Sequence, residues 1–322
     1  GDVLRAGIQD LPGHFTYKAS KYAPKGKKLS LGAGQTGSTP GMPIFLIDRR
    51  EPELKNMLRG LDRERPPAGG KSNPAPDFRA KLPQPGSPPH KTRELHVHPA
   101  PPQGGTRGEL GLWLDPRLLR RMSKTLLPKC WLWLPPVIWP GEEESWADLL
   151  EHTVRSGGRR FVLNGLSQIA LLPQRHRLEL WAGPFMNLAN PLALARMRDL
   201  GFGGAIVSPE LSRKDFLSLP RQSPLHLGLV LAGPFPYCIS RALAPELQPG
   251  LPLASPKKEI SWIATSGGTV YHYPQRELDL SPYREELKEA GYSLFVHFHR
   301  QFPKKIPRID RRSAFNWNLK LL

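Results

Sequence analysis

The sequence predicts an α/β fold, in its simplest form a (β/α) barrel, complete or modified. Two observations predict it: short apolar runs alternate with segments of helical length after residue 109, and the alternation continues almost to the C-terminus. Short buried strands joined by helices form a mostly parallel sheet, and seven or eight such strands close into a barrel. An open doubly wound sheet is the alternative, but no Gly-x-Gly-x-x-Gly turn follows a predicted strand.

The elements of the predicted barrel domain, residues 109–322, follow from short apolar runs and from helix start and stop signals. Strands are expected at residues 110–114, 130–134, 160–164, 176–182, 204–207, 225–231 and 292–297. Helices are expected at residues 116–122, 142–156, 191–200, 213–219 and 282–290. Between the last two strands, residues 259–264 and 269–273 are expected to form a hairpin.

Two segments of different composition precede this domain. Residues 1–64 predict a small β-rich segment with strands near 14–18 and 44–47 and one helix at 53–61, opened by the segment that begins at Asp48. Residues 65–108 are rich in proline, glycine and basic residues and contain few apolar ones. Such a segment buries too little apolar surface to fold, so we expect a linker, disordered apart from one short strand at 94–98.

The charge points to one class of partner. The chain has 46 Lys and Arg residues against 28 Asp and Glu residues, a net charge of +18. A basic chain of this kind makes nucleic acid the first partner to consider, with structured RNA as the candidate partner, while a basic surface that only keeps the protein soluble is the alternative. The two cysteines exclude a disulfide framework and a four-thiolate site within this chain.

The sequence shows no targeting or membrane-spanning pattern. No apolar run approaches the ~20 residues that cross a bilayer, and the first residues lack the pattern of a signal peptide. We therefore expect a cytoplasmic protein without a membrane partner. The first residue is not methionine, and we expect the chain to belong to a longer polypeptide.

Polar residues near the ends of predicted strands are the candidates for binding, because barrel sites lie at the carboxyl ends of the strands. The candidates for substrate binding are Asn164, Asn187, Asn190, Tyr237 and Arg241. The alternative for Asn187 and Asn190 is that they form a turn and cap the helix that begins at Pro191, and capping is the better interpretation of Asn190.

Candidates for catalysis are weaker. Asn187 is one, Glu210 is placed at a strand end as a general base would be, and Cys238 lies in a loop after a strand. Capping of the next helix is the better interpretation of Glu210, and a buried, inert thiol is the commoner state of a cysteine such as Cys238. No complete catalytic motif is present.

A metal site is not predicted. His297 and His299 share one face of a strand, a spacing that suits a metal ion, but no third ligand is evident. His96 and His98 have the same spacing at the end of the predicted linker, where we do not expect a metal site.

Tryptophans and a basic tail are further candidates for RNA contact. Trp131, Trp133, Trp139 and Trp146 cluster around one strand, where packing is the preferred interpretation and base stacking the alternative. The basic C-terminal stretch supplies the candidates for contacts with RNA phosphates, which are Lys304, Lys305, Arg308, Arg311 and Arg312.

The order of these segments resembles a known family. The segments that carry the resemblance are residues 45–54, 131–136, 160–164, 178–190, 201–204 and 207–211. They look like the C-terminal half of a long member of the collagenase-like peptidases, peptidase family U32, whose catalytic type is unknown. The most specific stretch is 181–211, where a strand ending in Gly-Pro is followed by a helix and a Ser-Pro-Glu-Leu strand end.

The resemblance implies a barrel fold and, in a larger parent protein, a catalytic N-terminal barrel that acts on protein or RNA. Some members are tied to hydroxylation of RNA bases or quinone precursors by an iron–sulfur cluster on four cysteines. Cys238 lies near one family cysteine and the others are missing, so we expect no cluster and no cofactor in this chain. We expect a C-terminal module that assists the N-terminal barrel; a stand-alone RNA-binding module is the alternative, and proteolysis by this chain alone ranks last.

Overall fold

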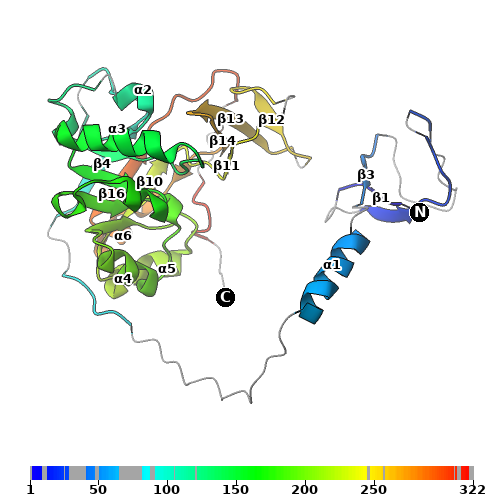
Figure 1. The fold of residues 1–322 in the computed structure, drawn as a ribbon, viewed down its shortest axis with the longest axis horizontal. Helices are drawn as coiled ribbons and strands as arrows, with labels where there is room; N and C mark the ends of the chain where they lie inside the picture. The colour runs from blue at the N-terminus through cyan, green and yellow to red at the C-terminus, as the bar shows by residue number, and fades with distance from the viewer. Residues whose placement is uncertain are drawn as a thin grey trace, which may run out of the picture. The chain divides into compact units, whose positions relative to one another are not determined.

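The computed structural model describes residues 2–8, 13–24, 26–28, 41–47, 51–64, 82–87, 91–104, 106–119, 122–244, 247–256, 258–307, 309 and 313–318. They belong to two compact units, residues 1–79 and 80–322. Figure 1 colours the first unit blue and the second from cyan to red.

The first unit is β-rich, as predicted. Strand β1 (Val3–Ala6) pairs antiparallel with β2 (Phe15–Lys18) on one side and with β3 (Ile44–Leu46) on the other. Helix α1 spans Glu51–Glu64, longer than predicted, and the opening of this helix at Asp48 lies outside the described residues.

The second unit contains a closed barrel of eight parallel strands. Strand β4 pairs with the last strand, β16, and β10 pairs with β9, so the ring has no open edge between them. The strands are β4 (Arg93–His98), β5 (Glu109–Trp113), β6 (Cys130–Trp133), β7 (Arg160–Leu163), β8 (Glu179–Ala182), β9 (Gly204–Ile206), β10 (His226–Gly233) and β16 (Leu294–Phe298). The predicted barrel is therefore confirmed, and the open sheet is excluded.

Strand β4 corrects the predicted boundary. It lies within residues 65–108, the predicted linker, so the barrel domain begins before residue 109. Leu95 and Val97 of this strand are fully buried, whereas His96 and His98 are only partly so. The short strand expected at 94–98 is therefore confirmed, but it belongs to the barrel and not to a linker; the surrounding prolines and its two apolar residues hid this in the sequence.

Helices cover the barrel unevenly. They are α2 (Pro116–Leu119), α3 (Glu143–Arg155), α4 (Pro191–Asp199), α5 (Arg213–Ser218) and α6 (Arg284–Ala290). The connection from β7 to β8 has two 3₁₀ turns, Leu166–Leu171 and Arg175–Arg177, so β8 begins three residues later than the strand predicted from residue 176. The described residues between β4 and β5 form no helix.

A second sheet is inserted between β10 and β16. Its four antiparallel strands run in the order β11 (Cys238–Ser240), β14 (Thr269–Pro274), β13 (Ile260–Ser266) and β12 (Pro252–Ala254). The predicted hairpin is β13 and β14, which register from Ser261 opposite Pro274 to Ser266 opposite Thr269. After it, β15 (Leu278–Asp279) pairs antiparallel with the end of β10. Figure 1 shows this sheet as a lobe beside the barrel.

The tryptophans on β6 pack in the core, as preferred from the sequence. Trp131 and Trp133 are fully buried, and Trp131 meets Trp181 edge to face inside the barrel with ring centroids 5.6 Å apart. Arg93 and Arg160 lie over the Trp131 ring and form ion pairs with Glu109 at 3.6 and 2.7 Å. These charges lie at the amino ends of the strands, so aromatic rings and ion pairs fill the barrel interior at that end.

Candidate binding site at the carboxyl end of the barrel

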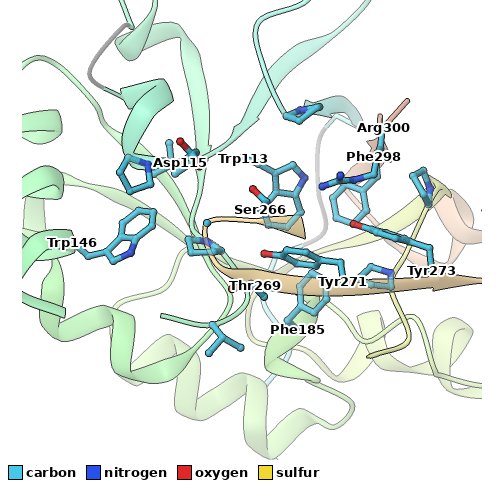
Figure 2. Close-up of a pocket in the computed structure, with 18 of the residues that line it drawn as sticks. Trp113, Asp115, Trp146, Phe185, Ser266, Thr269, Tyr271, Tyr273, Phe298 and Arg300 are labelled. Atoms are coloured by element: carbon cyan, nitrogen blue, oxygen red, sulfur yellow. The ribbon is translucent and has the colours of Figure 1, made fainter. Parts of the chain in front are cut away.

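A cavity of about 290 Å³ lies at the carboxyl end of the barrel, between the strand ends and the β13–β14 hairpin (Figure 2). Loops after β5, β6, β8, β10 and β16 all contribute to it. The side chains that define its chemistry are Trp113, Asp115, Glu142, Ser145, Trp146, Phe185, Ser266, Thr269, Tyr271, Tyr273, Phe298, His299 and Arg300. This is the end of a barrel where ligand sites are built.

Aromatic rings form one wall of the cavity. Trp113 ends β5, and its ring centroid lies 5.4 Å from that of Phe298 on β16 and 6.2 Å from that of Phe185 after β8. Phe185 in turn stacks on Phe235, with centroids 4.8 Å apart and an interplanar angle of 12°. The rings hold each other in place, so the wall is a firm surface against which a planar group can stack.

The β13–β14 hairpin supplies the opposite wall. Trp139, in the loop after β6, donates a hydrogen bond from Nε1 to Oγ1 of Thr269 at 2.9 Å, which fastens the hairpin to the barrel. From β14, Tyr271 and Tyr273 line the cavity, and both are almost fully buried. Burial raises the pKa of Tyr271 to about 12 and also raises the pKa of Tyr273. Both phenols are therefore neutral near pH 7 and can donate hydrogen bonds.

Arg300 places a positive charge beside these rings. Its guanidinium carbon lies 5.3 Å from the centroid of the Tyr273 ring and 6.0 Å from that of Tyr271. Among the described residues no carboxylate forms an ion pair with Arg300. Figure 2 shows Arg300 next to Phe298 at the margin of the cavity. An arginine held against aromatic rings without a carboxylate partner suits a bound anion.

The two carboxylates of the cavity are already engaged. Asp115 accepts a hydrogen bond from the backbone nitrogen of Arg117 at 2.7 Å, and Glu142 accepts one from that of Trp139 at 3.3 Å. Asp115 holds the start of α2, and Glu142 precedes α3. The arrangement therefore favours stacking and anion binding over acid–base chemistry by a carboxylate pair.

The predicted binding residues lie elsewhere. Asn164 is buried after β7, where its Nδ2 donates to the Leu134 carbonyl oxygen at 2.7 Å and its Oδ1 has no hydrogen-bond partner among the described residues. Asn190 caps α4 by accepting a bond from the Ala193 backbone nitrogen at 2.9 Å, which confirms capping. Asn187 adopts a left-handed backbone conformation and accepts a bond from the Ser208 hydroxyl at 2.5 Å. None of these three lines the cavity.

Tyr237 and Arg241 are close to the cavity in sequence but do not line it. The Tyr237 hydroxyl lies 3.0 Å from Nε2 of His272, on the small sheet. Arg241 lies over the Trp139 ring, 5.6 Å from its centroid. Both therefore support the lobe that closes the cavity.

For two of the catalytic candidates, Glu210 and Cys238, the predicted capping and burial are wrong. Glu210 is exposed and does not cap α5, because Ser212 caps it by accepting from the Asp215 backbone nitrogen at 3.3 Å. Cys238 is exposed on β11, contrary to the expected buried thiol, while Cys130 is buried and burial raises its pKa to about 11. Asn187, Glu210 and Cys238 do not form one cluster with the cavity.

Of the basic tail, Lys304 and Lys305 are exposed in a turn. Arg308, Arg311 and Arg312 lie outside the described residues. Lys304 and Lys305 follow Arg300 closely in sequence, so their charges extend along the chain that leaves the cavity.

The cavity residues escaped prediction because they come from distant segments. Trp113, Tyr271 and Arg300 have no common local spacing, and only their positions at strand ends or in the hairpin hinted at a shared site. The one usable signal was the aromatic and basic composition after the last strand, Phe298 to Arg300.

Comparisons of the chain with known proteins find no similar protein. No family model matches the chain, and searches among curated proteins and solved structures find no match. In the part of the chain that the structure describes, no helix combines the length and apolar character needed to cross a membrane.

Proposed function

We propose that this chain is an RNA-binding module of a protein related to the U32 collagenase-like peptidases, and that its cavity receives one nucleotide of structured RNA. The observation that carries the proposal is Arg300, held over Tyr271 and Tyr273 beside an aromatic cavity and without a carboxylate partner among the described residues. The charge of +18 supports the same class of partner.

The size and lining of the cavity suit a single base. A volume of about 290 Å³ is at the lower end for small-ligand sites, enough for one ring system and too little for a folded oligonucleotide. A base stacked on Trp113 or Phe185 gains about 1–3 kcal/mol. The adjoining phosphate then lies near Arg300, whose guanidinium binds phosphate oxygens in pairs.

In the parent protein, the module would hold the RNA for a catalytic N-terminal barrel, as the resemblance implies. The resemblance also allows a protein substrate. A cleavage assay with gelatin separates the two: the RNA proposal expects no cleavage by this chain and a measurable affinity for transfer RNA.

The direct test is fluorescence anisotropy with labelled transfer RNA, comparing Arg300→Gln with Arg221→Gln. Arg221 is exposed in the 3₁₀ turn that precedes β10, at the amino end of the barrel, so both variants lose one positive charge. We expect Arg300→Gln to weaken binding by roughly tenfold, about 1.4 kcal/mol, and Arg221→Gln to change it by less than about twofold.

Salt gives a second criterion. Each phosphate contact adds about −0.7 to −0.9 to the slope of log K against log salt, so affinity should fall steeply with salt and Arg300→Gln should reduce the slope. If both variants lost the same RNA affinity, Arg300 would contribute only general charge attraction, and the proposed phosphate contact would be wrong. Binding that is absent in about 50 mM salt would overturn the proposal.

A further inference from the structure

Four histidines gather on the outer side of the barrel, on a surface that we call the histidine face: His96, His98, His297 and His299. Strands β4 and β16 are parallel neighbours, and His297 lies opposite His96. Side chains alternate along a strand, and Leu95 and Val97 are fully buried while Phe298 packs on Trp113 and Trp133. The histidines therefore point away from the barrel interior. His299 also lines the cavity proposed for RNA, so the histidine face adjoins that site.

The rings are packed against one another. Nδ1 of His96 lies 2.9 Å from Nε2 of His299. His98 stacks on His299 with centroids 4.2 Å apart and an interplanar angle of 4°, and His297 stacks on His96 at 4.6 Å. A ring nitrogen from β4 thus faces one from the residue that follows β16, with His297 stacked on one ring and His98 on the other.

The neighbours fix the orientation of these rings. Burial is the largest effect on the pKa of His96 and lowers it, while a hydrogen bond with the Arg107 backbone acts in the other direction. With Nδ1 facing His299, Nε2 is the nitrogen left to donate that bond. A metal-binding histidine commonly donates its other ring N–H to a backbone carbonyl. Nε2 of His297 lies 2.7 Å from Glu94, so His297 is already engaged.

The histidines of this face also affect one another's ionisation. Burial lowers the pKa of His98, and burial together with the neighbouring imidazoles lowers that of His299 to about 4. Among the described residues no three His, Cys, Asp or Glu side chains are placed to hold one ion, so a metal site on this face takes at most two protein ligands from them.

We propose that His96 Nδ1 and His299 Nε2 chelate one divalent transition-metal ion of the Ni²⁺ or Cu²⁺ type. Two metal–nitrogen bonds of about 2.0–2.1 Å across 2.9 Å enclose an angle of about 90°. This angle fits adjacent positions of a square-planar or octahedral ion better than the tetrahedral geometry of zinc. When the ion binds, the proton that His299 Nε2 shares with His96 moves to Nδ1 of His299.

The remaining coordination positions are accessible. His98 and His299 line an open groove of about 400 Å³ that also includes Arg300 and Gln301. His299 itself is exposed. Water, or an anion attracted by Arg300, can therefore complete the coordination sphere from the groove.

The test uses the full chain without a histidine tag, titrated with NiCl₂ by calorimetry near pH 7.5. We expect one ion per chain, and we expect His96→Gln and His299→Gln each to weaken binding about tenfold or more. His226→Gln is the matched control: this histidine is exposed at the start of β10 and should leave binding unchanged.

A second measurement does not depend on any variant folding. Electron paramagnetic resonance of the wild-type chain with one equivalent of Cu²⁺ should show two coordinated imidazole nitrogens. One nitrogen or none would overturn the proposal. So would the lack of Ni²⁺ binding at about 1 mM, or binding that His96→Gln and His299→Gln leave unchanged.

Discussion

Nε1 of Trp139 donates a hydrogen bond to Oγ1 of Thr269, 2.9 Å away, and so ties the loop after β6 to the first residue of β14. The two residues are 130 positions apart in the chain. Thr269 itself is buried and lines the cavity. The bond therefore sets the position of the hairpin that carries Tyr271 and Tyr273 over the barrel.

Thr269→Val tests this relationship. Valine keeps the shape of threonine but removes the acceptor, and an unpaired buried N–H costs about 1–3 kcal/mol. We expect a lower unfolding midpoint in urea and weaker binding of transfer RNA, because Tyr271 and Tyr273 lose their fixed position. Thr265→Val is the control, since Thr265 is exposed on β13 and should change neither quantity. An unchanged RNA affinity in Thr269→Val would show that the position of the hairpin does not contribute to RNA binding.

Gly183→Ala is expected to destabilise the barrel. A Cβ atom at Gly183 would lie 1.9 Å from Oδ1 of Asn164, and Asn164 is held by its bond to the Leu134 carbonyl. Overpacking of this kind costs about 1–3 kcal/mol. Gly203→Ala is the control, because a Cβ there meets only the Leu180 carbonyl oxygen at 3.9 Å. Equal free energies of unfolding for the two variants, measured by urea denaturation, would contradict the close contact.

Asn190→Ala is expected to remove the cap of α4. The Asn190 side chain accepts the backbone hydrogen bond of Ala193, and loss of such a cap costs about 1 kcal/mol. Urea denaturation should show this loss, and Asn190→Ser should restore most of it because serine can accept the same bond. A serine variant as unstable as the alanine variant would mean that the asparagine acts in another way.

The sequence predicted what is local. The alternation of short apolar runs with helices predicted the parallel barrel. Each strand–helix unit can be recognised from its own residues, and such units in series build a parallel sheet that can close. Asn190 was interpreted as a cap correctly because Pro191 and the helix follow at once. Glu210 was interpreted as a cap wrongly, because Ser212, two residues later, offered a hydroxyl nearer the start of α5.

What the sequence did not predict depends on closure of the barrel. The short strand expected at 94–98 is present as β4, but its partner β16 lies about 200 residues further along the chain, so the sequence did not show that this strand belongs to the barrel. The same closure brings His96 to His299, and it brings Trp113 and Phe298 together in the cavity. Both sites are therefore properties of the closed ring and not of any one segment.

Acid is expected to destabilise the barrel where β4 meets β16. The pKa values of His96, His98 and His299 are lowered by burial, that of His299 to about 4. In the unfolded chain these imidazoles titrate near 6.5. Because the folded state disfavours their charged form, their contribution to stability is complete above about pH 6.5 and is lost as the pH falls towards 4.

The measurement is the urea midpoint between pH 7.5 and pH 5, in the presence of a chelator. His299→Gln should flatten this dependence, since glutamine cannot take up a proton, whereas His226→Gln at an exposed position should leave it unchanged. The range above pH 5 matters because most carboxylates titrate below it. A wild-type midpoint that stays constant between pH 7.5 and pH 5 would contradict the claim that the folded state disfavours the charged form of these histidines. A His299→Gln variant as pH-dependent as the wild type would contradict the part assigned to His299.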